Sequence, residues 1–188
     1  MWENPDVTAL RGQNLLLCVC GGIAAYKSAD LVRRLLDAGA SVRVAMTDNA
    51  QRFVGAATFQ ALSGHPVRTR LWDEHAEAAM GHIELARWPH RILIAPATAN
   101  TIAKLAHGFA DDLVSTLCLA TQAPIAIAPA MNRLMWAHPA TQANVDTLRS
   151  RGVAVLGPGE GGQACGETGE GRMLEPLQIV AALAEPTT

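Results

Sequence analysis

The side chain best suited to proton chemistry in this sequence is the thiol of Cys165, which lies in a glycine-rich stretch. Residues 157–171 hold seven of the chain's 16 glycines, and this composition predicts a mobile flap over about 157–172 instead of a packed core. A structural cysteine usually has apolar neighbours, whereas Cys165 stands between Ala164 and Gly166. The setting favours a reactive or proton-donating thiol.

Two other polar residues have types that catalysis uses. Asn132 offers amide donors and an acceptor, which suit the carboxylate or amide of a substrate, and Met135 nearby provides an apolar wall or part of the core. His82 directly follows Gly81 and is a candidate general base, with a helix cap or a surface histidine as the alternative. The sequence does not separate it from His65, His75 or His107. No histidine pair has a metal-binding spacing, so we assign no metal.

Small and polar residues follow the predicted strands, where a doubly wound sheet binds its ligand. Gly21-Gly22-Ile23 precedes a helix, so its backbone can approach an anion that the helix N–H groups attract. The Gly-x-Gly-x-x-Gly pattern is absent, which favours a mononucleotide phosphate over NAD, with a ligand-free turn as the alternative. Thr47 begins another such loop, and Thr98 and Asn100 form a third, in which either residue could be only a helix N-cap.

Apolar runs that alternate with helical stretches predict parallel strands covered by helices on both faces. The predicted strands cover 14–20, 41–46, 91–95, 124–128 and 153–156, the third ended by Pro96. The predicted helices cover 23–38, 51–63, 100–107, 112–120, 140–151 and 177–184. We expect one α/β domain over 1–188, a three-layer Rossmann-like doubly wound parallel sheet with its core over about 14–184. Residues 64–81 form the least regular connection before the glycine-rich stretch.

Composition excludes several functional classes. Of 188 residues, 49% are hydrophobic and 17% are charged, below the roughly 25% charged residues of most soluble domains, which favours subunit contacts. A net charge of -2 without a Lys/Arg run argues against nucleic acid. No apolar stretch reaches the roughly 18 residues of a membrane span, and no secretory signal is present. Four cysteines without a disulfide pattern indicate a reducing cytoplasm.

Five motifs occur together in a specific order. They are Gly21-Gly22-Ile23-Ala24-Ala25-Tyr26-Lys27, Gly81-His82-Ile83-Glu84, Ala95-Pro96-Ala97-Thr98-Ala99-Asn100, Pro129-Ala130-Met131-Asn132-x-x-Met135-Trp136 and Ala164-Cys165-Gly166-x-x-Gly169-x-Gly171-Arg172-Met173. Together they resemble phosphopantothenoylcysteine decarboxylase, within the flavin-dependent cysteine decarboxylases, over about 14–184. Cys20 stands where this family usually has serine, and a thiol is a poorer phosphate donor than a hydroxyl.

The resemblance implies FMN-dependent decarboxylation of 4'-phosphopantothenoylcysteine to 4'-phosphopantetheine in coenzyme A biosynthesis, through a thioaldehyde and an enethiol. His82 would act as base or orienting group, Asn132 would hold the substrate carboxylate or amide, and Cys165 would protonate the enethiol carbon. The implied substrate contacts are Asn132, Met135 and Ala164. The implied FMN contacts are Gly21, Gly22, Ile23, Thr47, Thr98 and Asn100.

The resemblance also implies a homo-oligomer, trimer or dodecamer, with flavin near a subunit interface, and a fused or associated phosphopantothenate–cysteine ligase. Oxidative decarboxylation of a peptide C-terminal cysteine and flavin prenylation are alternative reactions, and the flap with Cys165 speaks against both. A non-catalytic FMN-binding regulator is a further alternative. It is disfavoured because a pure binder needs none of His82, Asn132 and Cys165.

Overall fold

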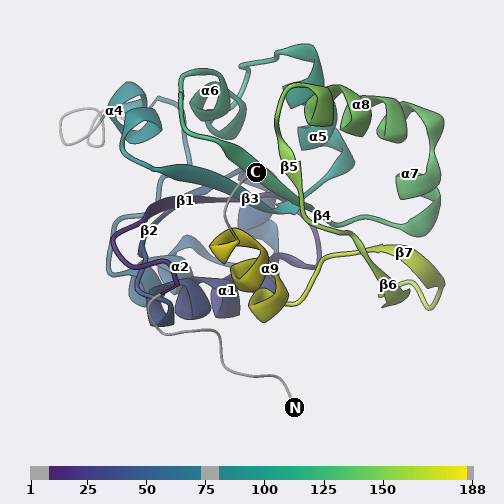
Figure 1. Cartoon of the computed structure of the whole chain (residues 1–188), viewed down its shortest axis with the longest axis horizontal. Coiled ribbons are helices and arrows are strands. Elements are labelled where there is room, and N and C mark those ends of the chain that lie inside the picture. Colours follow the sequence, from purple (N-terminus) through teal and green to yellow (C-terminus); the bar gives the residue numbers. More distant parts are fainter. Residues whose placement is uncertain (1–8, 73–80, 186–188) are drawn as a thin grey trace.

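The computed structural model describes residues 9–72 and 81–185 and has a five-stranded parallel sheet at its centre (Figure 1). The strand order is β2-β1-β3-β4-β5, which confirms the predicted doubly wound sheet. The strands are β1 (Asn14–Val19), β2 (Ser41–Met46), β3 (Arg91–Ala97), β4 (Ile125–Pro129) and β5 (Ala154–Val155). Because all five run parallel, their carboxyl ends meet at one edge of the sheet.

Helices cover both faces of the sheet (Figure 1). One face carries α1 (Ala25–Asp37), α2 (Ala56–Ser63) and α9 (Pro176–Ala184). The other carries α4 (His82–Arg87), α5 (Ala99–His107), α6 (Leu113–Leu119), α7 (Arg133–Ala137) and α8 (Pro139–Ser150). A 3-10 helix, η1 (Asp48–Arg52), follows β2. No helix in the described ranges is long and apolar enough to cross a membrane.

The apolar run of the first strand follows from its position between the two helical layers. Leu15, Leu17 and Val19 pack into the cluster beneath α1 and α9. Leu16 and Cys18, which point to the opposite face, join the cluster beneath the other helices. Alternate residues of a strand face opposite sides, so a strand buried on both sides must be apolar at every position.

Two local predictions were wrong in detail, and two short helices were not predicted. Strand β3 does not end at Pro96 but continues to Ala97, with a register shift against β4 between Ile94 and Ala97. Proline has no N–H to donate, yet the carbonyl of Pro96 still accepts a hydrogen bond from the Cys20 N–H (3.3 Å). The helix predicted over 51–63 is divided into η1 and α2, because Gly55 has extended backbone angles. Helices α4 and α7, of six and five residues, were not predicted.

The glycine-rich stretch, which the sequence predicts as a mobile flap, forms a two-stranded antiparallel hairpin. Its strands are β6 (Gly159–Gly162) and β7 (Thr168–Arg172). Figure 1 shows the hairpin beside α7, beyond the carboxyl ends of β4 and β5. Gly171 has a positive φ of 128°, and a Cβ atom there would collide with the Met131 carbonyl. Glycine at this position therefore lets the hairpin lie directly against the loop after β4.

Candidate functional site

An open groove of about 1650 Å³ lies at the carboxyl ends of the strands. Ten residues predicted from the sequence line it: Gly21, Gly22, Ile23, Thr47, Thr98, Asn100, Asn132, Met135, Ala164 and Cys165. They come from the loops after β1, β2, β3 and β4, from the first turn of α5, from α7 and from the hairpin. The fold thus brings together positions up to 144 residues apart in sequence, the difference between Cys165 and Gly21. Among the described residues, His82 is the predicted site residue that does not line this groove.

The amino end of α1 supplies the part of the groove suited to an anion. No side chain caps this 13-residue helix, and its first turn carries no acidic residue. A Cβ atom on Gly22 would meet only the Thr98 Cγ2 atom, at 4.0 Å, whereas one on Gly21 would collide with Asn49. An uncapped helix end beside open space can bind a phosphate through backbone N–H groups. These residues therefore fit the phosphate of a mononucleotide cofactor.

The two predicted threonines serve as helix caps and also face the groove. The Thr98 Oγ1 atom accepts a hydrogen bond from the Thr101 N–H (3.3 Å) and caps α5. The Thr47 Oγ1 atom accepts one from the Ala50 N–H (3.3 Å) and caps η1. Both threonines are therefore helix N-caps, and both also line the groove. The exposed Asn100 lines the groove beside them.

Cys20, which stands where the family resemblance leads us to expect serine, is engaged within the protein. Its thiol is buried and accepts a hydrogen bond from the Thr101 hydroxyl (3.2 Å). Burial raises the pKa of this thiol to about 11, against the opposing hydrogen bonds of Thr101 and Thr98. Anion binding at this end of the groove accordingly falls to the backbone N–H groups of the loop.

The opposite end of the groove brings Asn132 and Cys165 together. The Asn132 Oδ1 atom accepts a hydrogen bond from the Leu134 N–H (2.8 Å) and caps α7. Its Nδ2 atom lies 2.7 Å from Glu167 Oε2 and 3.5 Å from Cys165 Sγ. The Cys165 thiol is exposed and donates to Glu167 Oε2 at 3.8 Å. An amide that can bind a carboxylate and a thiol that can donate a proton are therefore in direct contact.

Gln163 fixes the hairpin over the loop after β4. Its Oε1 atom accepts a hydrogen bond from the Arg133 N–H (3.1 Å). Its Nε2 atom donates to the carbonyls of Met131 (3.3 Å) and Glu170 (3.2 Å). The Met131 N–H in turn donates to the Gly171 carbonyl (2.9 Å). Backbone and side-chain bonds together hold the hairpin against the residues that carry Asn132.

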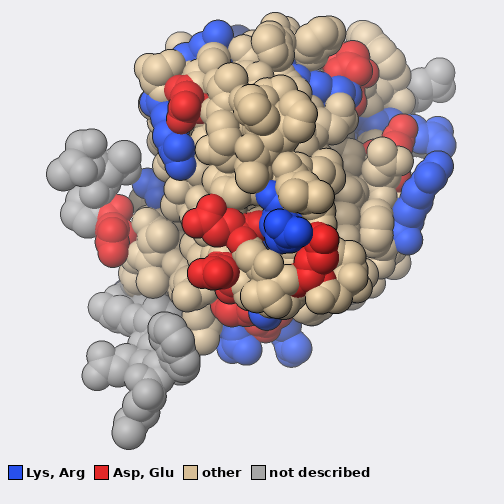
Figure 2. Space-filling view, turned by 90° about the vertical axis from the view of Figure 1, so that its right-hand side faces the viewer, with Lys and Arg blue, Asp and Glu red and all other residues tan. Residues whose placement is uncertain are grey.

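Sequence reasoning missed Glu167 as a site residue. Its hydrogen bond from Asn132, and then the nearby charge of Arg133, hold the pKa of its carboxyl below the usual value. Arg133 Nη2 lies 3.5 Å from Glu167 Oε1. Figure 2 views the molecule from the side of the hairpin and shows acidic side chains gathered around basic ones on this face. The sequence offered one signal for Glu167: it follows Cys165 by two residues, and a tight turn brings residues at that spacing close together.

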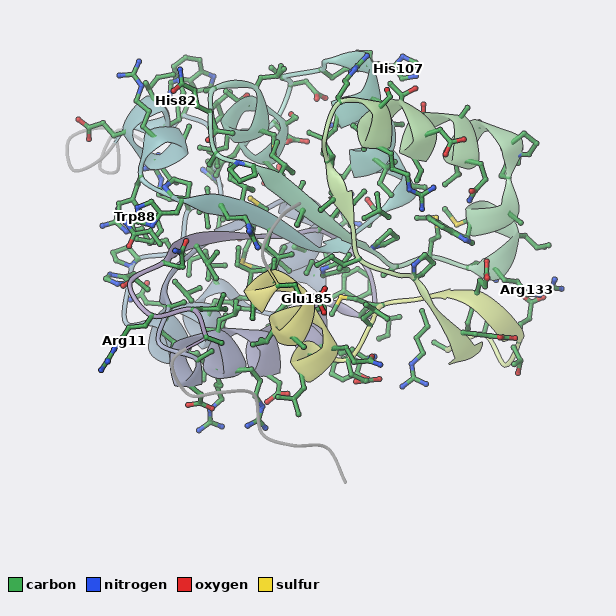
Figure 3. All side chains as sticks on the ribbon, in the orientation of Figure 1. Arg11, His82, Trp88, His107, Arg133 and Glu185 are labelled. Atoms are coloured by element: carbon green, nitrogen blue, oxygen red, sulfur yellow. The ribbon has the colours of Figure 1, made fainter. Side chains whose placement is uncertain are left out.

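His82 lies apart from the other predicted catalytic residues. It is the first residue of α4, and its ring meets the Trp72 ring edge-on with centroids 6.0 Å apart. Figure 3 shows His82 and Arg133, the neighbour of Asn132, on opposite sides of the molecule. A single chain therefore does not bring His82 to Cys165. Of the other histidines considered, His65 is half-buried and His107 is exposed, and His75 lies outside the described residues.

No group of three metal-ligating side chains occurs among residues 9–72 and 81–185. The four cysteines are free, and all except Cys165 are buried. The polar groups of the groove thus include backbone N–H groups at one end, Asn132 and Cys165 at the other, and charged side chains such as Lys104. Glu167 does not line the groove but accepts a hydrogen bond from Asn132.

Comparisons with known proteins identify relatives of this chain. It is 56% identical over 172 residues to the coenzyme A biosynthesis bifunctional protein CoaBC of Escherichia coli (strain K12), covering 92% of this chain and 42% of that protein. It is 50% identical over 171 residues to CoaBC of Bacillus subtilis (strain 168), covering 91% of this chain and 42% of that protein. The chain therefore spans about two fifths of the length of these relatives.

Solved structures share the fold over nearly their whole length. A PPC decarboxylase mutant complexed with pantothenoylaminoethenethiol superposes with a TM-score of 0.80 and 30% identity, covering 92% of this chain and 97% of that one. The FMN-dependent cysteine decarboxylase SpaF superposes with a TM-score of 0.76 and 32% identity, covering 93% of this chain and 98% of that one. The Flavoprotein family matches residues 3–188. With its sheet order, its groove and these relatives, the chain belongs to the Flavoprotein family.

Proposed function

We propose that this chain is an FMN-dependent decarboxylase that converts 4'-phosphopantothenoylcysteine to 4'-phosphopantetheine in coenzyme A biosynthesis. The observation that carries the proposal is the contact between Asn132 and Cys165, 3.5 Å apart, in a groove whose other end suits a phosphate. Support comes from 56% identity to a CoaBC protein and from the fold shared with a PPC decarboxylase. The proposed unit is a single decarboxylase domain.

FMN is the proposed cofactor, and the residues of the groove fit it. The backbone of Gly21-Gly22-Ile23 at the uncapped end of α1 would hold the phosphate, with Thr47, Thr98 and Asn100 alongside. When bound, FMN would accept a hydride from the substrate carbon that bears sulfur and return it after carbon dioxide has left.

The side chains at the hairpin end would act on the substrate directly. The Asn132 Nδ2 group would hold the substrate carboxylate, with Met135 and Ala164 beside it. Once the carbon bearing sulfur is oxidised, the electron pair of the breaking C–C bond can flow into the C=S bond. Cys165 would then protonate the carbon that has lost carbon dioxide, and its exposed thiolate would take a proton from water.

We also propose that His82 acts in the groove of another subunit of a homo-oligomer, a trimer or a dodecamer. Within one chain, His82 lies on the opposite side of the molecule from Arg133 (Figure 3), and it does not line the groove that contains Cys165. Exposed apolar side chains lie next to both regions: Ile23, 62% exposed, lines the groove, and Trp72, 77% exposed, lines the groove and also contacts the His82 ring. Apolar surface of this kind is buried at subunit interfaces. A phosphopantothenate–cysteine ligase, fused or associated, is the further proposed partner, and the four free cysteines suit a cytoplasmic location.

The proposal is tested with three variants and 4'-phosphopantothenoylcysteine as substrate. Cys165→Ser should release carbon dioxide but accumulate an enethiol and reduced flavin, because the proton donor of the second half is missing. His82→Asn should stop carbon dioxide release. His107→Asn, a matched change at an exposed histidine at the end of α5, should behave like the unchanged protein.

Two assays distinguish these outcomes: mass spectrometry identifies the products, and trapping measures the carbon dioxide released. Normal yield of phosphopantetheine from Cys165→Ser would remove Cys165 as proton donor. An unchanged protein that binds flavin but does not consume the substrate would refute the decarboxylase proposal and favour a binding role. Enethiol as the final product of the unchanged protein would favour oxidative decarboxylation of a peptide C-terminal cysteine.

A further inference from the structure

Glu167 accepts a hydrogen bond from the same Asn132 side-chain amide that, in the proposed function, binds the substrate carboxylate. Its Oε2 atom accepts from the Asn132 Nδ2 group at 2.7 Å, the shortest of the three contacts that this amide nitrogen makes. We propose that Glu167 is a positioning residue: the substrate carboxylate displaces it from Asn132, and it returns when carbon dioxide leaves, placing the Cys165 thiol for the protonation step. This inference rests on the proposed function.

The contacts of the hairpin indicate which acceptor gives way. An amide nitrogen has two hydrogens, and the Asn132 Nδ2 atom faces Glu167, Gln163 (3.4 Å) and Cys165 (3.5 Å). Gln163 is held by three further hydrogen bonds to the backbone. Beyond its contacts with Asn132 and Cys165, the Glu167 carboxylate contacts Arg133 Nη2 at 3.5 Å, while the Glu167 backbone carbonyl accepts a hydrogen bond from the Gln163 N–H (2.8 Å). A ligand carboxylate at Asn132 would thus displace Glu167 most easily.

Charge makes the exchange exclusive. The substrate carboxylate and the Glu167 carboxylate are both negative, and like charges placed against one donor repel. While the substrate retains its carboxylate, it therefore keeps Glu167 off Asn132. Carbon dioxide is neutral and cannot hold the amide in the same way, so its formation lets Glu167 return.

The return of Glu167 also determines where the thiol lies. Cys165 Sγ lies within donating distance of Glu167 Oε2 (3.8 Å) and of Gln163 Oε1 (3.9 Å). Only Gly166, with a φ of 86°, separates Cys165 from Glu167. With Glu167 on Asn132, the thiol is 3.5 Å from the amide that had held the carboxylate. This is where the carbon that has lost carbon dioxide must gain its proton. Glu167 would therefore bring the donor to that carbon after, and not before, decarboxylation.

The proposed step balances without another reagent. Carbon dioxide leaves with both oxygens of the substrate carboxylate, and the C–C electron pair becomes part of the enethiol double bond. The Cys165 thiol gives its proton to the carbon that lost carbon dioxide, while the hydride removed earlier returns to the carbon bearing sulfur. Glu167 gains and loses no proton in this scheme, because it only moves between positions.

A binding experiment tests the exchange apart from turnover. The FMN-loaded protein is titrated by calorimetry with 4'-phosphopantothenoylserine, which keeps the carboxylate but has no thiol to oxidise, and with 4'-phosphopantetheine, which has no carboxylate. Glu167→Gln removes the competing charge and should bind the serine compound about tenfold more tightly, with phosphopantetheine affinity within about twofold of the unchanged protein. Glu160→Gln, on strand β6 of the same hairpin, is the matched control and should change neither affinity.

Single turnover of 4'-phosphopantothenoylcysteine gives the second readout. Glu167→Gln should release carbon dioxide at least as fast as the unchanged protein but convert the enethiol more slowly, so the ratio of enethiol to phosphopantetheine rises. Glu167→Asp, which keeps the charge, should restore most of the normal ratio. If the role of Glu167 were merely structural, its substitution would slow carbon dioxide release and enethiol conversion together.

Two results would overturn the inference while leaving the proposed function intact. One is an unchanged affinity of Glu167→Gln for the serine compound. The other is an equal slowing of carbon dioxide release and enethiol conversion in an otherwise active enzyme. If the unchanged protein releases no carbon dioxide from phosphopantothenoylcysteine, the proposed function fails and the inference fails with it.

Discussion

Gly21 and Gly22 are adjacent, yet replacing each with alanine should have different consequences. A Cβ atom on Gly21 would collide with Asn49, whose Cβ and backbone atoms are its nearest neighbours. A Cβ atom on Gly22 would meet only Thr98 Cγ2, at 4.0 Å, and would otherwise face the groove. Gly21→Ala should therefore weaken the fold itself, whereas Gly22→Ala should weaken the binding of the FMN phosphate.

The sizes of the two effects follow from these contacts. Overpacking against backbone that cannot easily move costs about 1–3 kcal/mol, so Gly21→Ala should lower the Tm of the flavin-free protein by roughly 3–10 °C for a chain of this length. Gly22→Ala has room and should leave that Tm unchanged or raise it slightly, since alanine reduces the entropy of the unfolded chain. Crowding one charge-assisted bond from backbone to phosphate costs about 1.5–3 kcal/mol, or roughly 10- to 150-fold in FMN affinity.

Two measurements on each variant separate the effects. Thermal unfolding of the flavin-free protein reports stability, and quenching of FMN fluorescence on titration reports affinity. Riboflavin, which has no phosphate, serves as a control ligand and should bind Gly22→Ala about as well as it binds the unchanged protein. Normal FMN affinity in Gly22→Ala would show that the loop before α1 does not hold the phosphate. An unaltered Tm in Gly21→Ala would contradict the packing argument.

Two further predictions concern stability and thiol reactivity. Glu175→Gln should cost about 1–2 kcal/mol at neutral pH, because it leaves the buried Lys27 with the Met173 carbonyl (3.1 Å) but without its charged partner at 2.8 Å, while the half-exposed Glu175 is partly screened. The hydrogen bond from Lys27 lowers the pKa of Glu175 from its usual 4.5. The difference in unfolding free energy between the unchanged protein and Glu175→Gln should therefore persist above that pH and shrink as pH falls below it. A pH-independent difference would contradict this. At pH 8, alkylation followed by mass spectrometry should label the exposed Cys165 but neither Cys20 nor Cys118, whose pKa values burial raises to about 11 and about 12. Rapid labelling of a second cysteine in the folded protein would contradict the burial of the other three cysteines.

The sheet was predictable because its sequence signals are local. The strand predicted over 41–46 has those bounds in the structure. Continuous apolar runs indicated strands buried on both faces, and the residues after each run identified the groove. The proline at position 96 was misleading: its missing N–H suggested a strand end, but the strand continues through a register shift.

The hairpin and the short helices were not predictable in the same way. Helix α7 has five residues, too few to show a helical period. Strands β6 and β7 are mostly glycine and polar residues, without the apolar alternation that marks a half-buried strand. Glu167 looks like an ordinary surface charge until the hairpin places it 2.7 Å from Asn132. Its importance depends on a contact between segments 35 residues apart, which local patterns do not encode.

The two ends of the groove have different physical support, and this difference suits the two tasks proposed for them. The anion end is formed by loops that leave buried strands, so its backbone N–H groups are held in place by the core of the sheet. The proton-donating end is carried by a hairpin whose strands are largely exposed. This hairpin is held to the loop after β4 and to α7 by one backbone bond and by side-chain contacts of Gln163, Glu167 and Glu170. A cofactor that must stay in one position through both halves of a reaction needs the first kind of support. A thiol that must act only after carbon dioxide has gone needs the second, because a carboxylate such as Glu167 can exchange with substrate only where few contacts hold it.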